Sequence, residues 1–423
     1  MSLTASTTTD LSNHPNYKWY VLILTALTGT FVLAAPLMCL SVLFNEISAD
    51  LHLNLFQVGL IWSIGNLPGI FTSLLGGAIT DRFGPKRVIL TSTLLLGLAG
   101  VLRGLAGDFT SLMSVSLLVG ALGPLISICA FKICGLWFPR HQLGLANGVF
   151  ALGMASGFLI GSLVSATFLS PWLGGWRNVM FFYAILTMLL TIPWFFTLAK
   201  PHSAAARGSI ENPAIPIRQA MARIIKIKNI WLLGIAILGM GGCVQGLTGY
   251  VPIYLRGLGW PGASADGALA LFNAMSLTFV LVFTMVSDRL KTRKLLLMGM
   301  FLMITLGSGL LAFANGWLVW GAVSMAGMVR DGSMALVMAM AVETDGVGPI
   351  YAGTATGFMM LCINLGSLVA SPIGNQLGTL NPGLPFIFWA GMAALGLASL
   401  ALVKNPKLTH LVATTPRLLE SEA

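Results

Sequence analysis

Twelve runs of about 20 predominantly apolar residues follow one another along this chain, separated by short polar connections. A transmembrane helix needs about 20 apolar residues, whereas the strands of a membrane barrel alternate apolar and polar residues over about 10 positions. The unbroken runs therefore predict an all-α integral membrane protein. Only 9% of the residues are charged, far below the level of about 25% in soluble domains. The predicted spans are 18–44, 56–79, 88–106, 111–137, 143–169, 177–198, 231–255, 267–287, 295–314, 317–341, 351–376 and 383–403.

The longest polar break divides these spans into two sets of six. It runs from Ala199 to Asn229 and carries six basic residues. Within it, Pro216 to Lys228 is predicted to form an amphipathic helix on the membrane surface. The expected organisation is a tail at 1–17, a six-helix half at 18–198, a linker at 199–229, a second six-helix half at 230–404 and a tail at 405–423.

The placement of lysine and arginine predicts the orientation. With both termini on the cytoplasmic side, the inner loops and tails hold 18 of the 23 basic residues. The outer side holds Arg103, Arg177 and Arg256, while Lys132 and Arg330 lie within spans. Because cytoplasmic loops carry the basic excess, we expect a multi-pass protein of the cell (inner) membrane with both termini cytoplasmic. Topology and anionic lipid explain the net charge of +10, so no nucleic-acid partner is expected.

Two short motifs recur at nearly the same offset. Asp81-Arg82 after the second span is matched by Asp288-Arg289 after the eighth, 207 positions later. The segment from Gly144 to Gly148, which opens the fifth span, is matched by Gly353 to Gly357 in the eleventh, 209 positions later. These offsets indicate two homologous halves. Such repeats are typical of secondary transporters, whose solute site lies near the midplane between the repeats.

The loop after the second span resembles the signature motif of the major facilitator superfamily. The motif is a glycine, three residues, Asp-Arg, one residue, a glycine and then basic residues. With twelve spans and the second copy after the eighth, the resemblance covers roughly residues 18–404 and points to a bacterial member of organic-anion type. The matching segment reads Gly77-Ala78-Ile79-Thr80-Asp81-Arg82-Phe83-Gly84-Pro85-Lys86-Arg87.

The resemblance implies that this loop controls a cytoplasmic gate. In the family, the motif aspartate meets the N-terminal end of a helix in the other half, and the arginines join a charge network. We therefore expect Asp81 near Tyr351 to Thr354 and Asp288 near Gln142 to Gly144, each at the positive end of a helix. The expected gating residues are Gly77, Asp81, Arg82, Gly84, Lys86, Arg87, Asp288 and Arg289.

Two features of the spans qualify the resemblance. Many family members carry an arginine in helix 4, four residues before a glycine, but here Ser116 stands four residues before Gly120. The proton-linked roles of that arginine are therefore not expected here. Gly153, Gly157 and Gly161 repeat every four residues in the fifth span, and this spacing predicts close packing against a neighbouring helix.

Two cations inside spans carry the prediction of a substrate. The resemblance implies that helices 1, 4, 7 and 10 line the central cavity, and Lys132 is on the fourth span and Arg330 on the tenth. Two cations facing one cavity suit an anion, and arginine can bind a carboxylate through two hydrogen bonds. Two alternatives stay open. Lys132 can snorkel to the inner interface, and Arg330 can form a structural pair with Asp331 or another polar group.

Asp331 is the only acid deep in any span, which makes it the candidate for proton coupling. Adjacent helix positions point about 100° apart, so Asp331 and Arg330 need not touch. Uncharged candidates for the substrate site also lie in the spans, although such groups often hydrogen-bond helices together. They are Gln245, Tyr250, Asn273 and Asn364.

Together these features predict a secondary transporter that moves a small organic anion, a mono- or dicarboxylate, by alternating access with proton symport or exchange. The alternative is a drug, sugar or other neutral-solute carrier of the same fold. An enzyme, a cofactor and a metal site are not expected, because the spans contain no histidine, metal-ligand cluster or nucleophile motif. We expect a monomer whose partners are the anionic solute, protons and membrane lipid.

Overall fold

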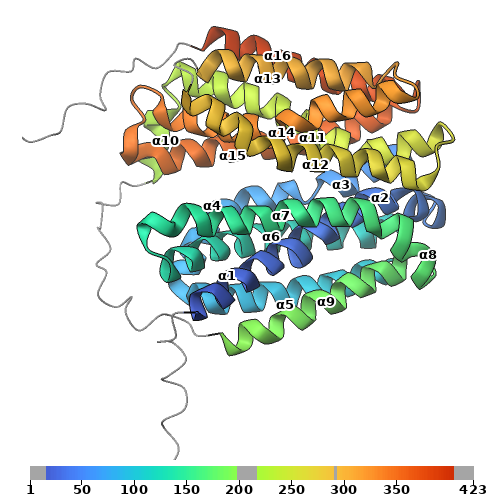
Figure 1. The fold of residues 1–423 in the computed structure, drawn as a ribbon, viewed down its shortest axis with the longest axis horizontal. Coiled ribbons are helices and arrows are strands. Elements are labelled where there is room, and N and C mark those ends of the chain that lie inside the picture. The colour runs from blue at the N-terminus through green and yellow to red at the C-terminus, as the bar shows by residue number, and fades with distance from the viewer. Residues whose placement is uncertain (1–15, 198–216, 290–292, 404–423) are drawn as a thin grey trace, which may run out of the picture.

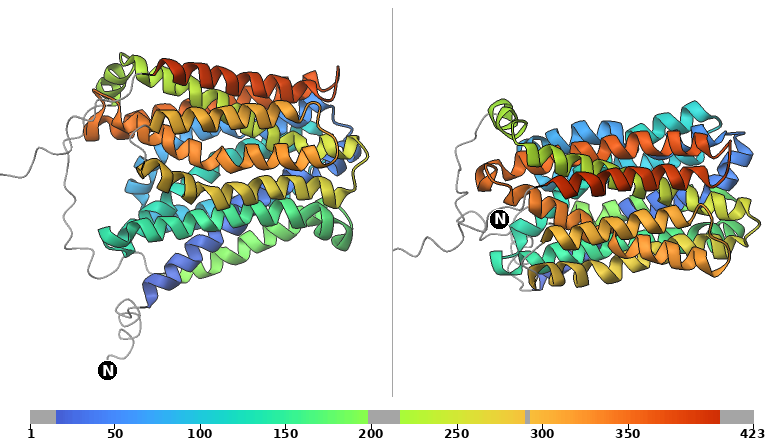
Figure 2. Two further views of the ribbon diagram at one scale, coloured as in Figure 1. Left: turned by 45° about the horizontal axis from the view of Figure 1, so that its top comes forward. Right: turned by 90° about the horizontal axis from the view of Figure 1, so that it is seen from above.

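Long helices run side by side between the two ends of an elongated bundle (Figures 1 and 2). The computed structural model describes residues 16–197, 217–289 and 293–403. Within these residues, 12 helical spans are long and apolar enough to cross a membrane. The predicted all-α fold of twelve spans is therefore confirmed.

The N-terminal half contains six spans, of which the first, second and fifth are each built from more than one helical segment. Short π turns, η2 and η4, interrupt the first and fifth spans. In order, the elements are α1 (Tyr17–Thr28), η2 (Gly29–Ala34), α2 (Ala35–Asp50), α3 (Leu55–Ser63), α4 (Asn66–Phe83), α5 (Pro85–Gly104), α6 (Phe109–Trp137), η3 (Arg140–Gln142), α7 (Leu143–Val164), η4 (Ser165–Leu169), α8 (Ser170–Leu173) and α9 (Trp176–Phe196).

The C-terminal half contains the other six spans, preceded by one short helix. These are α10 (Ile217–Ile224), α11 (Lys228–Gly257), α12 (Gly262–Arg289), α13 (Arg293–Leu310), α14 (Trp317–Glu343), α15 (Gly348–Leu377) and α16 (Leu384–Leu402). The short helix α10 lies within the predicted amphipathic segment. Its Ala220 and Ile224 are buried, and α10 packs against α15 rather than standing apart from the bundle.

The motif loop joins α4 to α5 through a tight reversal. Gly84 has a φ of +83°, a conformation that glycine adopts without steric cost. Pro85 then begins α5, where its missing N–H is no loss to the helix. We call this end of the bundle the motif end. The opposite end, where α2 passes into α3, is called the distal end, and there Asn54 caps α3 by accepting a hydrogen bond from the Gln57 N–H at 2.9 Å.

Small residues bring α7 against the first span. A Cβ atom built on Gly153, Gly157 or Gly161 would lie about 2.4–2.5 Å from a backbone oxygen of that span. The Thr30 hydroxyl also donates to the Gly153 carbonyl at 2.8 Å. The glycine repeat in the fifth span is therefore a packing surface, as the sequence predicts.

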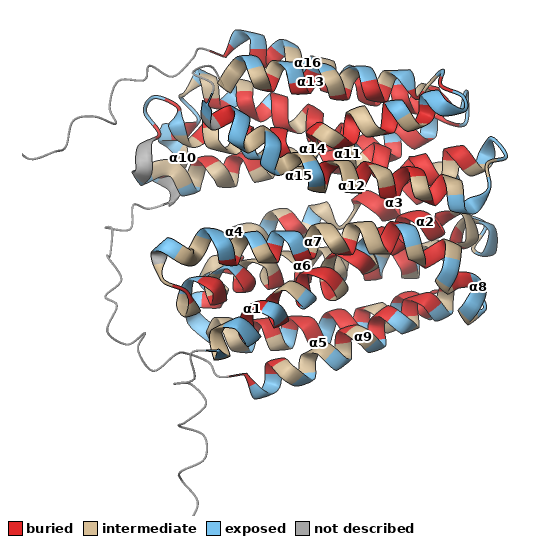
Figure 3. Ribbon diagram, in the orientation of Figure 1, coloured by how far each residue is buried: buried red, intermediate tan, exposed pale blue. Residues whose placement is uncertain are grey.

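The largest buried cluster crosses from one half to the other at the distal end. It includes Phe44 and Trp62 from the N-terminal half and Leu247 and Phe272 from the C-terminal half. Figure 3 shows buried residues concentrated where α11, α2 and α3 meet. A second cluster, with Val21 among its members, belongs to the N-terminal half alone. The apolar core therefore joins the halves at one end of the molecule.

Candidate functional site

A cavity of about 290 Å³ lies inside the N-terminal half and reaches the boundary with the other half. Its walls come from the first span and from α3, α4, α5, α6, α7 and α9, and the C-terminal half adds Gln245 of α11 and Asn364 of α15. Most of the lining side chains are aliphatic or aromatic. Of the described residues that line it, Arg103 alone carries a charge, and no acid is among them.

Arg103 sits in the last turn of α5 with only 5% of its surface exposed. Its Nε atom is buried without a hydrogen-bond partner, and no carboxylate among the described residues pairs with it. The sequence assigned Arg103 to the outer side as a topology residue. The structure instead directs its side chain into the bundle, because α5 continues to Gly104 and packs between α6 and α9.

Ser116 of α6 lines the same cavity and is also buried, and its hydroxyl has no partner among the described residues. This is the residue that stands four positions before Gly120, where many family members are expected to carry an arginine. The helices pack closely here, since a Cβ atom on Gly120 would lie 2.1 Å from the Gly65 carbonyl oxygen. The fourth span therefore contributes a hydroxyl to the cavity, and the neighbouring third span contributes the cation.

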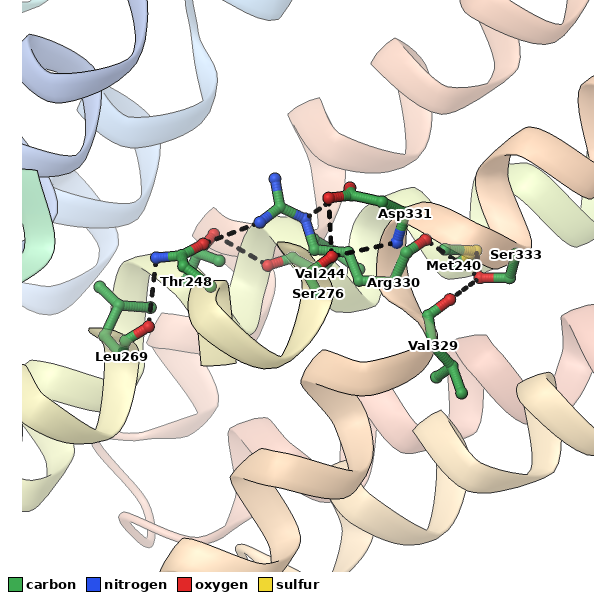
Figure 4. Close-up of polar contacts among 10 residues, drawn as sticks. Met240, Val244, Thr248, Leu269, Ser276, Val329, Arg330, Asp331 and Ser333 are labelled. Carbon is green, nitrogen blue, oxygen red and sulfur yellow. Dashed lines mark hydrogen bonds and ion pairs between the residues drawn. The ribbon is translucent and has the colours of Figure 1, made fainter. Parts of the chain in front are cut away.

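Arg330 lies at the middle of α14 and is held by a network of its own (Figure 4). Its Nη1 donates to Asn273 Oδ1 at 2.8 Å, and its Nε lies 3.3 Å from Asp331 Oδ1. The guanidinium also lies over the rings of Phe158 and Phe272 at 5.1 and 5.7 Å. The two adjacent charges do meet, because the long arginine side chain spans the angle between neighbouring helix positions. Arg330 is not among the residues that line the cavity.

Asp331 completes this network from the other side. The Ser276 hydroxyl donates to Asp331 Oδ2 at 2.6 Å, and the Asp331 backbone N–H donates to the same hydroxyl oxygen at 3.3 Å. The Asp331 side chain is 35% exposed, against 13% for Arg330. Through Asn273, the network also contacts the other half, since Asn273 donates to the Ser162 hydroxyl of α7 at 3.4 Å.

Lys132 lies near the motif end of α6 and binds the motif segment. Its ammonium group is 2.7 Å from Asp81 Oδ1 and donates to the Gly77 carbonyl at 3.0 Å. The structure thus brings together a predicted substrate residue and two predicted gating residues. Lys132, like Arg330, does not line the cavity.

The uncharged candidates separate into two groups. Gln245 and Asn364 line the cavity, and the side chain of Gln245 donates to the Trp62 carbonyl across the two halves at 3.1 Å. Tyr250 lies elsewhere, in an aromatic cluster with Phe386, and its hydroxyl donates to the Pro382 carbonyl at 3.3 Å. Asn273 serves the Arg330 network, as described above.

The predicted gating residues lie at the motif end, and most are open to solvent. The Asp81 side chain is 77% exposed and is bound by Lys132 rather than lying at the start of α15. The Arg82 guanidinium lies 5.6 Å from the centre of the Phe83 ring. Lys86 is partly buried, whereas Arg87 and Arg289 are exposed. The side chain of Asp288 lies outside the described residues.

Hydrogen bonds join the halves at the distal end. Arg256 Nη2 donates to the fully buried Asp266 carboxylate at 2.7 Å, and its Nη1 donates to the Val42 carbonyl of the other half at 2.8 Å. Thr167 Oγ1 donates to Asp266 Oδ2 at 2.8 Å, again between halves. The Trp62 indole donates to the Gln245 carbonyl at 2.8 Å. We call the set formed by Arg256, Asp266, Thr167 and Val42 the distal latch.

Glycines show the contrast between the two ends. At the distal end, a Cβ atom on Gly59 would lie 2.6 Å from the Ser371 carbonyl oxygen of the other half. At the motif end, a Cβ atom on Gly77, Gly144, Gly148 or Gly353 would meet nothing within 4 Å. In Figure 1 the ribbons of the two halves likewise lie apart near the labels α4 and α10 and approach near α2 and α3. The halves are therefore in contact at the distal end and apart at the motif end.

The described residues contain no group of three His, Cys, Asp or Glu side chains that could hold a metal ion. The five cysteines, Cys39, Cys129, Cys134, Cys243 and Cys362, are all buried as free thiols.

Comparison with known proteins supports a transport fold. Residues 26–371 match the sequence model of the Major Facilitator Superfamily. The chain is 27% identical to the probable nitrate/nitrite antiporter NarK1 of Thermus thermophilus, covering 95% of this chain and 93% of that protein. It is 28% identical to the 3-(3-hydroxy-phenyl)propionate transporter of Escherichia coli (strain K12), covering 82% and 86%. The multidrug resistance protein MdtG of Klebsiella pneumoniae (strain 342) is 30% identical, covering 47% of this chain and 50% of that protein.

A solved structure has the same fold. It is the crystal structure of a bacterial homologue of the human lysosomal transporter Spinster, in an inward-facing and unoccupied conformation, and it superposes with a TM-score of 0.72. The match covers 92% of this chain and 95% of that one at 17% sequence identity.

Proposed function

The chain belongs to the major facilitator superfamily, and on that basis we propose that it is a secondary transporter of a small organic anion that works by alternating access. One observation carries the choice of an anion: the only charged residue that lines the cavity is an arginine, and no acid lies beside it among the described residues. An uncompensated cation out of water is unfavourable, and an incoming anion relieves that cost.

The contrast between the two ends supports alternating access. The distal end is closed by the distal latch and by buried apolar residues, and the motif end has exposed gating residues and uncovered glycines. This is the arrangement expected of a carrier that is open on the side of its motif loops. In the opposite state of the cycle, which is closed at the motif end, Asp81 would separate from Lys132 and contact the start of α15, and the distal latch would open.

The proposal also covers the orientation, the coupling and the oligomeric state. The basic excess supports a cytoplasmic motif end, cytoplasmic termini and the inner membrane. Asp331 remains the proposed site of proton coupling, since it is a partly exposed carboxylate beside a cation in the middle of a span. Exchange of one anion for another is the alternative to proton symport. We propose that the protein works as a monomer surrounded by lipid.

Relatives support an anion more than a cationic drug. Two relatives that are matched over most of their length are named for nitrate or nitrite and for a phenylpropionate, which are anions. A multidrug resistance protein is matched over only half its length. A cationic drug would also be expected to meet an acid in its site, and the cavity lining has none. A sugar carrier would be expected to offer more amide and carboxylate groups.

The test is uptake by purified protein in proteoliposomes, using a panel of inorganic and organic anions with and without an imposed pH gradient. We expect uptake of at least one organic anion, and accumulation driven by an inward proton gradient if coupling is symport. Counterflow without dependence on pH would favour exchange. Transport of neutral or cationic solutes with no transport of any anion would overturn the proposal.

A further inference from the structure

Arg103 differs from four other basic residues whose side chains the structure describes, each of which has an acidic partner. Lys132 pairs with Asp81, Arg177 with Asp50, Arg256 with Asp266 and Arg330 with Asp331. Arg103 is the most deeply buried of the set and has no such partner among the described residues. An ionised group inside a membrane protein is normally paired or faces a cavity that binds something. Arg103 faces the cavity.

A second buried polar group lines the same cavity. Ser116 lies on α6, which runs antiparallel to α5 and packs against it. Both residues lie in the distal part of their helices, and both have a side-chain polar atom without a hydrogen-bond partner among the described residues. Few buried polar atoms in native proteins lack a partner. Two of them on adjacent helices around one cavity are the feature from which we argue for a binding site.

The remaining walls separate into an apolar part and an amide part. Leu33 from the π turn η2 and Met154 and Met180 from α7 and α9 are among the apolar lining residues. The amides Gln245 and Asn364 come from the C-terminal half, where α15 packs against α3 and α4. Because α5 packs against α6 and α9, Arg103 lines a different side of the cavity than the amides of α11 and α15. A ligand of matching chemistry has one charged end, an apolar body and a polar or neutral far end.

We propose that this cavity is the anion-binding site and that it selects an organic monocarboxylate with an apolar, ring-sized body. The carboxylate would be bound by Arg103 and Ser116, the body would lie along the apolar wall, and Gln245 and Asn364 would bring the C-terminal half against the far end. This assignment rests on the proposed function, since it names the site and substrate class of the same transporter.

Size and charge set the selectivity. A volume of about 290 Å³ equals that of roughly ten waters, which suits a ligand of about that many non-hydrogen atoms. A small inorganic anion would satisfy Arg103 but bury no apolar surface against the walls. A dicarboxylate would place its second charge where no described lining residue is a cation. Both are therefore expected to bind more weakly than a monocarboxylate of ring size.

The test is direct binding to purified full-length protein in detergent, measured by calorimetry with benzoate, terephthalate, nitrate and benzyl alcohol as probes. We expect benzoate to bind most tightly, and each of the other three to bind about tenfold or more weakly. Arg103→Gln should weaken benzoate binding by roughly ten- to a hundredfold, and Ser116→Ala by about two- to tenfold. Arg103→Lys should restore part of the loss, because it returns the charge without the planar fork.

Arg177→Gln is the matched control, since it removes an arginine of the same half that lies outside the cavity and pairs with Asp50. If Arg103→Gln does not fold, Arg103→Lys and Ser116→Ala in folded protein decide the question. Benzoate binding that is unchanged in folded Arg103 and Ser116 variants would overturn the site, and nitrate or terephthalate binding as tightly as benzoate would overturn the substrate class. Either result leaves anion transport standing. Binding of benzyl alcohol alone, with no anion bound or transported, would overturn the proposed function as well.

Discussion

Arg103, near the distal end of α5, and Arg330, at the middle of α14, are two arginines with side chains inside the bundle and opposite surroundings. Arg330 has an ion pair with Asp331, a hydrogen bond to Asn273 and two aromatic rings beside it. Arg103 is more deeply buried and has none of these among the described residues. Removing one member of a buried ion pair leaves the other charge without compensation. Replacing an arginine that has no ion-pair partner leaves no such charge behind. We propose that Arg330 supports the fold and that Arg103 binds the solute.

The largest expected effect is on transport by Arg103→Gln. We expect uptake of the native anion to fall by roughly ten- to a hundredfold at subsaturating concentration, because a charge-assisted hydrogen bond contributes about 1.5–3 kcal/mol. The unfolding temperature should be unchanged or higher, since the variant removes a buried charge that has no partner. The check is initial uptake rates and thermal unfolding of the same preparations. If Arg330→Gln costs more solute affinity than Arg103→Gln, the comparison is reversed and the sequence-based assignment of Arg330 is favoured.

The next effect concerns stability and belongs to Arg330. Arg330→Gln should lower the free energy of unfolding by about 1–3 kcal/mol, less than the full cost of breaking a buried pair because Asp331 is 35% exposed. The double variant Arg330→Gln with Asp331→Asn should recover part of this loss. Chemical denaturation of the two single variants and the double variant measures the coupling. Additive effects of the two changes would mean that the pair does not stabilise the fold.

A third prediction separates coupling from binding. Asp331→Asn removes the carboxylate but leaves Arg103 untouched, so exchange of the anion should persist while proton-driven accumulation is lost. The measurement is counterflow and pH-driven uptake in matched proteoliposomes. An imposed pH gradient that drives accumulation as well in the variant as in the parent protein would exclude Asp331 as the coupling site.

The smallest effect is expected at the motif end. The Asp81–Lys132 pair is largely exposed, and such pairs contribute only about 0–1 kcal/mol. Asp81→Asn should therefore leave the free energy of unfolding nearly unchanged. It should still favour the state that is open at the motif end, because the proposed contact of Asp81 with α15 in the other state is lost. A cysteine placed at exposed Gly353 reports on this, since the native cysteines are buried. Labelling and flux identical to those of the parent protein would argue against a gating role for Asp81.

The sequence predicts those features that depend on local pattern. Hydropathy over about 20 residues fixes the spans, and the paired motifs reveal the two halves. The roles of individual charges depend instead on which way a helix turns its side chains. Arg103 lies in the last turn of α5, where a cation on one face would anchor the span to lipid headgroups and on another face enters the bundle. Packing of α5 between α6 and α9 decides this, and a single sequence does not contain that information.

The partners of Lys132 and Arg330 also could not be predicted from the sequence, although one partner is distant along the chain and the other is adjacent. Lys132 meets Asp81 from 51 positions away because α4 and α6 pack together, and the sequence gives no measure of that packing. Arg330 and Asp331 are adjacent, and their angular separation suggested that they need not touch. Their contact depends on the reach and bend of the arginine side chain, which helix geometry alone does not determine. Of the predicted polar residues, Gln245 and Asn364 reach the cavity, whereas Tyr250 packs among aromatic rings.

The uncovered glycines at the motif end have a consequence for engineering this protein. Alanine is favoured over glycine within a helix by about 0.5–1 kcal/mol, and a methyl group on Gly77, Gly144, Gly148 or Gly353 would meet no neighbour in this arrangement. A screen for heat resistance in detergent would therefore reward these replacements. In a carrier that closes its motif end once per transport cycle, the same methyl groups would lie between the two halves and hinder closure. Heat-resistant variants selected at these positions would then transport more slowly. Replacing the four glycines one at a time would lower the transport rate in steps.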